Sequence, residues 1–210
     1  MIRNRVVCAA LIALVGFASA SRAGDLAQMS PESCQRYGQH LSELFERENG
    51  ERQVKFEVDP TQATGLHEDQ DGILVVPIKG LKEGEIDPAV ESENGGGLCY
   101  LFVSPCYTPV VDGKPIDSKK LRRVRFKNGQ GDDREAICFV VTVKHVGGDD
   151  WRLLAFGAEK TPVIDARFSE SQENVDRTLA IRVSGGKDNK ANLALTLYKK
   201  YSASFAIGQK

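Results

Sequence analysis

The sequence predicts a mostly β protein, an antiparallel β-sandwich of about 8–10 strands with one N-terminal amphipathic helix packed on it. Three observations lead to this prediction. In one stretch near the N-terminus, apolar residues recur with the period of a helix. In nearly all of the chain after Gly50, apolar and polar residues alternate with a period of two. Glycine-rich turn sequences separate these alternating runs. Many short strands between frequent turns are typical of sandwiches and barrels.

The helix is predicted over about residues 31–48. Ser30 can cap it with its hydroxyl, Pro31 suits the first helical position, and Asn49-Gly50 supplies the stop. Its apolar residues recur at three- and four-residue spacing and form one stripe, made of Cys34, Tyr37, Leu41, Leu44 and Phe45. We expect this stripe to dock on a sheet.

Strands are predicted from about residue 53 to residue 207. Val54, Phe56 and Val58 alternate with polar residues, which predicts a half-buried strand. The denser apolar runs at 73–78, 98–103 and 137–143 are typical of central strands that are covered on both faces.

The C-terminal segment has the clearest alternation in the chain. Apolar residues of one parity recur from Leu193 to Ile207, which predicts one long strand or two strands bent near Lys199-Lys200. Residues 179–183 alternate in the same way, and we expect them to pair with this segment as a hairpin through the loop at 184–190.

Residues 1–23 have the features of a signal peptide. Arg3 and Arg5 precede an uncharged apolar run of 12 residues, 6–17, and small residues follow it. A membrane-spanning helix needs roughly 20 apolar residues, so the run fits a cleaved export signal. We therefore expect residues 24–210 to form a single exported domain, periplasmic or extracellular, with no transmembrane segment.

The charge of the exported domain indicates which partners to expect. Removing residues 1–23 takes away three arginines and no acid, so the formal net charge changes from −1 to −4. Nucleic-acid-binding domains are strongly basic, so no nucleic-acid partner is expected.

The chain has no Asn-x-Ser/Thr sequon, which favours a bacterial envelope over a eukaryotic secretory route.

Four cysteines of the exported domain are predicted to form two disulfides, because paired cysteines are the rule in oxidising compartments. They are Cys34, Cys99, Cys106 and Cys138. Three connectivities are open. One of them closes a turn between Cys99 and Cys106 and joins the helix to the sheet through Cys34 and Cys138.

The same cysteines suggest two other chemistries. Zinc could be held by three of them with His145, but the six-residue gaps differ from the C-x2-C to C-x4-C pairs of zinc sites. In a regular strand Cys138 and His145 also point to opposite faces. A cysteine nucleophile activated by His145 or His67 needs a proximity that the sequence does not fix. We predict no metal and no cofactor.

Residues 67–72 resemble part of a calcium-binding loop, with oxygen-bearing side chains at alternate positions and a glycine at the sixth. The match fails at its first and twelfth positions, His67 and Ile78, where an EF-hand needs Asp and Glu. An acidic turn that leads into the strand at Ile73 explains the segment better.

The only concentrated charge run covers residues 119–127. In a strand, Arg123, Arg125 and Lys127 would line one face and could bind an acidic glycan, a lipid headgroup or an acidic partner such as an envelope protein. The competing interpretation is a solvated edge strand, in which cations deter aggregation between sheets. Asp132, Asp133 and Glu135 lie close in sequence and could neutralise the patch.

No motif of a known catalytic class is found in the sequence: it has no G-x-S-x-G, H-E-x-x-H, Walker loop or G-x-G-x-x-G. Trp151 is predicted to open a strand, with sugar stacking as its functional alternative. The leading hypothesis is an exported, non-catalytic envelope or extracellular protein that acts by binding or structural support. The alternatives are a secreted hydrolase with an acidic or Cys/His site, and an anionic-polymer or carbohydrate-binding module.

Overall fold

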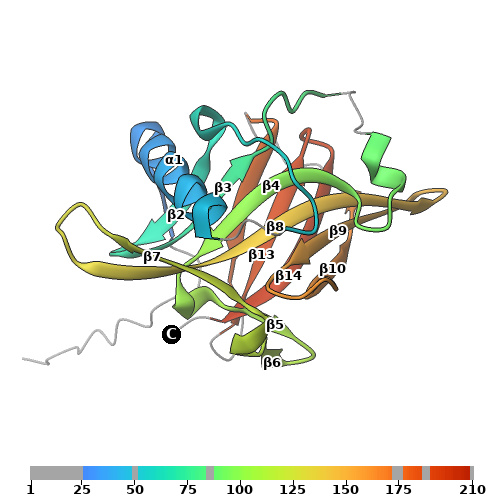
Figure 1. The fold of residues 1–210 in the computed structure, drawn as a ribbon. Helices are drawn as coiled ribbons and strands as arrows, with labels where there is room; N and C mark the ends of the chain where they lie inside the picture. The colour runs from blue at the N-terminus through green and yellow to red at the C-terminus, as the bar shows by residue number, and fades with distance from the viewer. Residues whose placement is uncertain (1–25, 49–51, 84–87, 172–176, 186–189, 209–210) are drawn as a thin grey trace, which may run out of the picture.

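One helix covers a sandwich of two antiparallel sheets in the computed structural model, as the sequence predicts (Figure 1). The structure describes residues 26–48, 52–83, 88–171, 177–185 and 190–208. The predicted signal peptide, residues 1–23, lies outside these ranges. Among the described residues, no helix is both long and apolar enough to cross a bilayer.

The larger sheet has eight strands and contributes most of the core. Its order is β1-β2-β3-β4-β8-β9-β10, and β7 pairs with β8 beside this path. The bounds are β1 Ala27–Gln28, β2 Thr64–Glu68, β3 Asp71–Pro77, β4 Gly96–Val103, β7 Arg122–Lys127, β8 Asp133–Gly147, β9 Asp150–Phe156 and β10 Ile164–Arg167.

The smaller sheet has six strands in the order β12-β13-β14-β5-β6, with β11 paired to β14. The bounds are β5 Pro109–Val111, β6 Lys114–Pro115, β11 Ser169–Glu170, β12 Leu179–Ser184, β13 Lys190–Leu197 and β14 Tyr201–Gly208. Short 3-10 turns η1 to η4 lie at Pro60–Gln62, Pro88–Glu91, Pro105–Tyr107 and Ser118–Lys120. Across the described residues, ten strands have four or more residues, which agrees with the predicted 8–10 strands. Four shorter strands of two or three residues come in addition.

The period-two pattern of the central strands divides their side chains between two apolar clusters. On β3, Ile73 and Val75 pack in the cluster between the two sheets, whereas Leu74 and Val76 pack in the cluster beneath the helix. β4, β8 and β9 alternate in the same way. Both faces of the larger sheet are therefore buried, as the dense apolar runs predict.

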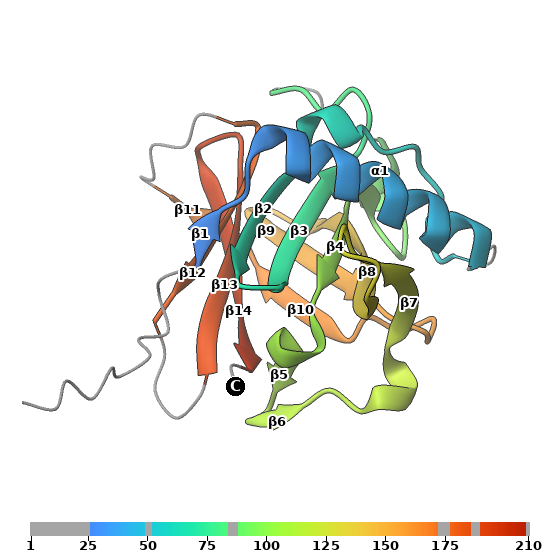
Figure 2. The ribbon, with the colours of Figure 1, turned by 90° about the vertical axis from the view of Figure 1, so that its left-hand side faces the viewer.

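Helix α1, Pro31–Glu48, covers the outer face of the larger sheet where β2 and β3 lie beneath it (Figure 2). The Ser30 hydroxyl accepts a hydrogen bond from the Ser33 amide at 3.2 Å, which is the predicted N-terminal cap. Leu41 and Phe45 are buried, with Phe45 fully so. The predicted stripe therefore docks as expected.

Strand β8 is long because its two edges pair with three strands. One edge pairs with β4, while the other pairs first with β7 and then with β9. Where β7 and β9 meet, the Ala158 amide donates to the Lys120 carbonyl at 2.8 Å. A Cβ placed on Gly157 would lie 2.0 Å from that carbonyl oxygen, so this junction admits only glycine.

The strand predicted at Val54, Phe56 and Val58 does not form as a strand. Only Val58 makes an isolated antiparallel bridge, to Ile78. The alternation has a different cause, because Phe56 and Val58 pack against the helix-side cluster while the intervening residues face outward. An extended segment on an apolar surface has the same period as a paired strand.

The C-terminal alternation belongs to a hairpin of two strands, β13 and β14, which turns at Tyr198-Lys199. Both turn residues have positive φ, 53° and 60°. This left-handed conformation at both central positions is typical of tight hairpin turns, although glycine and asparagine usually supply it. The predicted pairing of 179–183 with this segment is confirmed, with Leu179 opposite Leu197 and Ile181 opposite Leu195.

Candidate functional site

The four predicted disulfide cysteines, Cys34, Cys99, Cys106 and Cys138, are reduced in the structure and form no disulfide with one another. The disulfide prediction is therefore corrected. Cys99 lies in β4 four residues before the end of that strand, and Cys106 lies in the following turn. The strand from Cys99 to Val103 spans about 13 Å, so the turn would have to fold back along β4 to bring the two Cα atoms within the roughly 7 Å that a disulfide needs.

The second predicted pair is separated across the sheet. The thiol of Cys34 donates to the Met29 carbonyl beside β2, and Cys138 lies on β8. Three strand spacings separate β2 from β8 in the sheet order, which is about 14 Å. Both residues lie in the helix-side cluster, so Cys34 contributes to docking by packing and not by a covalent bond.

The thiols also differ from an activated nucleophile. Burial raises the pKa of Cys34, Cys99 and Cys138 above the ordinary thiol value. A reactive cysteine needs the opposite shift, because the thiolate is the nucleophile. His145 contacts Glu91 and the Gly148 carbonyl at 2.6 and 3.0 Å. Within the described ranges, no three His, Cys, Asp or Glu side chains gather as a metal site would require.

The predicted basic face forms on β7 with the expected parity. Val124 is fully buried, while Arg123, Arg125 and Lys127 are exposed. Each cation lies near an acid of the neighbouring strand β8. Glu135 forms ion pairs with both arginines, and Asp133 lies 2.8 Å from the Lys127 ammonium. Because these cations are paired with acids, the main argument for anion binding by the basic face no longer holds.

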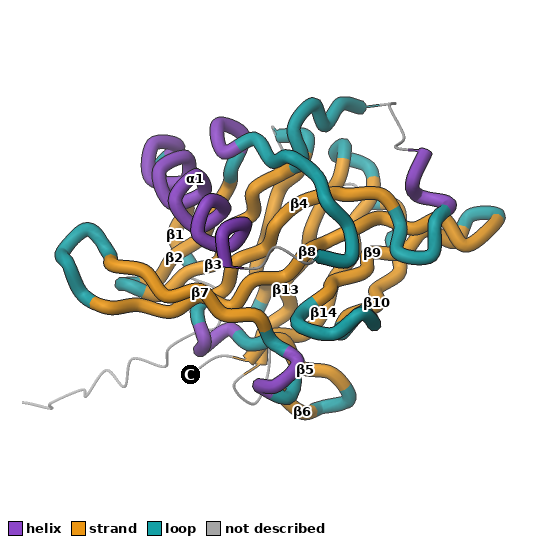
Figure 3. The backbone as a smooth tube through the Cα atoms, in the orientation of Figure 1, coloured by secondary structure: helices purple, strands orange, loops and turns teal. Residues whose placement is uncertain are grey.

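The acidic turn predicted at 67–72 becomes the tip of the β2–β3 hairpin, with Asp69 at a positive φ of 52°. A second hairpin tip, residues 128–132 between β7 and β8, lies beside it. The Gln70 amide donates to the side-chain carbonyl of Gln130 at 3.5 Å, which joins two turns that are 60 residues apart. The β7–β8 hairpin projects from the edge of the sheet, as Figure 3 shows.

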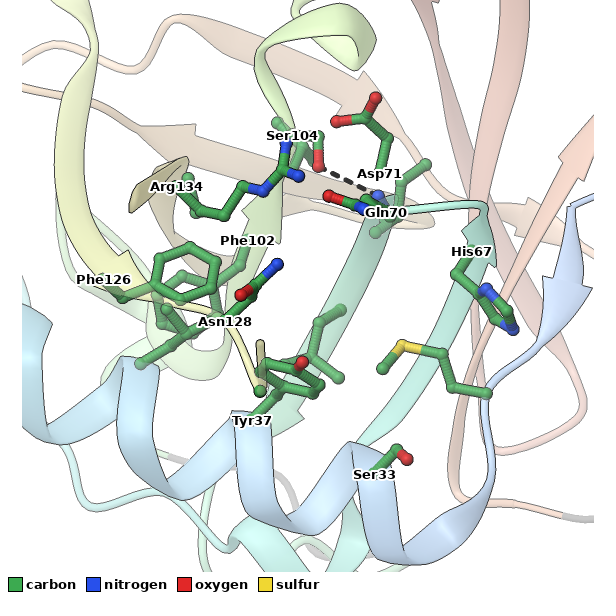
Figure 4. A pocket seen from close by; sticks show the side chains of 18 of the residues that line it. Ser33, Tyr37, His67, Gln70, Asp71, Phe102, Ser104, Phe126, Asn128 and Arg134 are labelled. Atoms are coloured by element: carbon green, nitrogen blue, oxygen red, sulfur yellow. Dashed lines mark hydrogen bonds between the residues drawn. The ribbon is translucent and has the colours of Figure 1, made fainter. Parts of the chain in front are cut away.

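The two hairpin tips and the first turns of α1 enclose a pocket of about 430 Å³. We name it the helix–sheet pocket. Its floor comes from β3 and β4, and α1 forms one wall. Tyr37, Gln70, Asn128 and Arg134 come from four different elements and surround the same space in Figure 4.

Aromatic rings form one side of the helix–sheet pocket. Tyr37 on α1 meets Phe126 on β7 edge to face, with ring centroids 6.4 Å apart. Phe102 on β4 also lines the pocket. Tyr37 is only partly buried, and its phenol group offers both a donor and an acceptor beside an apolar ring.

Planar polar side chains form the other side. The Asn128 carbonyl oxygen accepts from the amides of Gln130 and Asp132, each at 2.9 Å, so the hairpin tip holds this side chain in place. Ser104 accepts from the Gly72 amide at 2.9 Å and fixes the other tip (Figure 4). The Nε atom of Arg134 is buried without a hydrogen-bond partner. A buried unpaired donor beside a pocket is a group that a polar ligand can satisfy.

The charges around the pocket nearly balance. Arg36 and Arg134 line it together with Asp69, Asp71 and Glu135, of which Glu135 is paired with Arg123 and Arg134 lies 3.8 Å from Asp132. A site for a polyanion would carry a clear excess of cations. The geometry therefore suits an uncharged polar ligand.

The sequence did not indicate this pocket. Its residues come from α1, from the two hairpin tips and from strands β3, β4, β7 and β8, and the sequence pointed to the helix, the acidic turn and the charge run at 119–127 for separate reasons. The predicted sugar platform, Trp151, lies elsewhere, in β9, where its ring stacks on His145 at 4.5 Å. Tyr37, which follows Arg36 in the helical stripe, is the residue that could have pointed to an aromatic wall.

Comparison with known proteins adds no relative from which a function could be carried over. No protein-family model, curated protein or solved structure matches this chain.

Proposed function

We propose that the protein is an exported binding protein whose helix–sheet pocket takes a neutral polar ligand, with a sugar as the best-fitting class. A sugar ring has an apolar C–H face and a rim of hydroxyl groups that both donate and accept. The rings of Tyr37 and Phe126 match the apolar face, and the amide group of Gln70 and the phenol group of Tyr37 match the hydroxyl groups.

The observation that carries the proposal is the convergence of these aromatic and planar polar groups in one pocket with balanced charge. A carbohydrate is favoured over an anionic polymer, because the exposed cations of β7 are paired with acids and the pocket has no cationic excess. Export is part of the proposal and rests on residues 1–23 of the sequence.

Titration calorimetry of the mature protein with neutral mono- and disaccharides tests the binding. We expect a saturable heat for at least one of them and a loss of about tenfold or more in affinity for Tyr37→Ala, which corresponds to about 1.4 kcal/mol. His40→Ala is the matched control, because His40 also contacts Phe126 but does not line the pocket. Equal weakening by both variants would contradict the assignment, as would the absence of binding at about 10 mM saccharide.

Mass spectrometry of the bound saccharide after incubation distinguishes the hydrolase alternative. An intact ligand agrees with binding alone, whereas cleavage products that disappear in Tyr37→Ala would assign hydrolysis to the same pocket. Sequencing the N-terminus of the protein recovered from the periplasm or the medium tests export separately. We expect a mature chain that begins near Gly24.

A further inference from the structure

A second cavity lies between the two sheets, away from the helix–sheet pocket, and has a volume of about 690 Å³. We name it the inter-sheet cavity. Leu98 of β4, Val143 of β8 and Leu197 of β13 line it, so both sheets contribute to its wall. All three belong to the apolar cluster between the sheets or pack against it. The cavity is therefore an open continuation of the core.

We propose that the inter-sheet cavity binds a single acyl chain whose small polar headgroup stays at the rim. The volume falls within the range of about 300–1,000 Å³ that is typical of small-molecule sites. Burying an unbranched chain there removes its apolar surface from water and fills a space that is lined by aliphatic and aromatic side chains.

Four aromatic side chains line the inter-sheet cavity. They are Trp151, Phe168, Tyr198 and Tyr201. Tyr201 is one of three large apolar side chains that are exposed among the described residues. Tyr198 has a left-handed backbone conformation, and its amide donates to the Thr178 carbonyl at 2.8 Å, which fixes the turn.

The rim is polar and mixed in charge. Its charged lining residues are two cations, Lys79 and Lys82, and two acids, Asp149 and Glu170. The Lys79 ammonium also lies 3.1 Å from Glu57. A rim of this composition accepts either an anionic or a neutral headgroup. The cavity therefore recognises the acyl chain of the ligand and not its headgroup. A fatty acid and a monoacylglycerol share this chemistry.

Trp151 is the only tryptophan in the chain, and it lines this cavity. At a fixed pH, where the protonation of the His145 ring stacked on it does not change, its fluorescence reports on occupation of the cavity. Bromine atoms on an acyl chain quench tryptophan fluorescence by contact, so 9,10-dibromostearate is the probe, with unlabelled stearate as competitor. We expect saturable quenching at micromolar concentration that stearate reverses, and monostearoylglycerol shows whether a neutral headgroup is accepted as well.

Val143→Phe fills the cavity from its wall, and we expect it to weaken quenching at least tenfold. Val146→Phe is the matched control, because Val146 is exposed on the same strand and does not line the cavity. Thermal unfolding of both variants shows whether each one folds. Quenching that does not saturate, or that Val143→Phe leaves unchanged in a folded protein, overturns the proposal. Tyr37→Ala must leave the quenching intact, because the helix–sheet pocket is a separate site.

Discussion

The ring of Phe45 on α1 meets the ring of Tyr100 on β4 edge to face, with centroids 5.1 Å apart and an interplanar angle of 66°. Phe45 is fully buried and also contacts Phe102. The Tyr100 hydroxyl in turn donates to Glu46 at 3.1 Å. This contact fixes the C-terminal half of the helix on the sheet, while the first half forms the wall of the helix–sheet pocket.

Phe45→Ala is expected to destabilise the protein by about 3 to 5 kcal/mol, because it removes a buried ring and leaves a cavity that the sheet cannot close. Chemical denaturation followed by circular dichroism measures the change. Substituting the exposed Arg47 by alanine provides the control, with an effect within about 0.5 kcal/mol. A loss below about 1 kcal/mol for Phe45→Ala would mean that the helix is not anchored by this ring.

Gly157→Ala is expected to destabilise by about 2 kcal/mol or more, because the added methyl group meets the Lys120 carbonyl oxygen, a backbone atom that cannot rotate away. Gly129→Ala is the matched control. Nothing lies within 4 Å of a Cβ at that position, so its effect should be small. Comparable unfolding midpoints for the two variants would show that β7 and β9 do not abut on β8 as described.

Stability is expected to depend on pH through His145. The hydrogen bond to the Gly148 carbonyl, together with Glu91, raises the pKa of this imidazole above its ordinary value. A raised pKa means that the folded state binds the proton more tightly than the unfolded state does. The stabilisation is therefore complete below the unfolded value of about 6.5 and is lost as the pH rises through the folded pKa.

Two measurements check this behaviour. The fluorescence of Trp151, which stacks on the imidazole, should change with an apparent pKa above about 6.5. Glu91→Gln should lower that midpoint. The difference in thermal stability between the wild type and His145→Gln should be greater at about pH 6 than at about pH 9. A difference that increases with pH would reverse the sign and contradict the assignment.

Thiol reactivity tests the cysteine correction directly. Cys34, Cys99 and Cys138 are buried, and burial raises the pKa of each thiol, so alkylation of the native protein should be slow at all three. Cys106 is only partly buried and should react first. Intact-mass analysis should show four alkylations of the mature chain after unfolding, without prior reduction. If the unfolded protein took up four alkyl groups only after reduction, the disulfide prediction would be restored.

The helix was predictable because its signals are local. The Ser30 cap, Pro31 and the stripe from Cys34 to Phe45 depend only on neighbours within a few residues of sequence. The central strands were predictable for a related reason, since a strand that is buried on both faces must be apolar at every position, as residues 137–141 are. These patterns fix the fold class without information on partners.

The cysteine pairing was not predictable in the same way. Compartment and an even number of thiols indicate disulfides, but a bond forms only between Cβ atoms that the fold brings together. The structure places Cys99 and Cys138 on opposite faces of the sheet, in different apolar clusters. The order and register of the strands decide which cysteines lie close together, and no local sequence pattern predicts them.

By itself the sequence determined the helix, the buried strands, the hairpin of 179–183 with its partner, and the parity that puts Arg123, Arg125 and Lys127 on one face. Only the tertiary structure decided that acids of β8 pair with those cations, and that Tyr37, Gln70 and Asn128 share a pocket. The reason is physical: hydrogen bonding and side-chain alternation along the chain set each element, whereas a pocket depends on contacts between elements far apart in sequence, which arise only when the sheets and the helix pack.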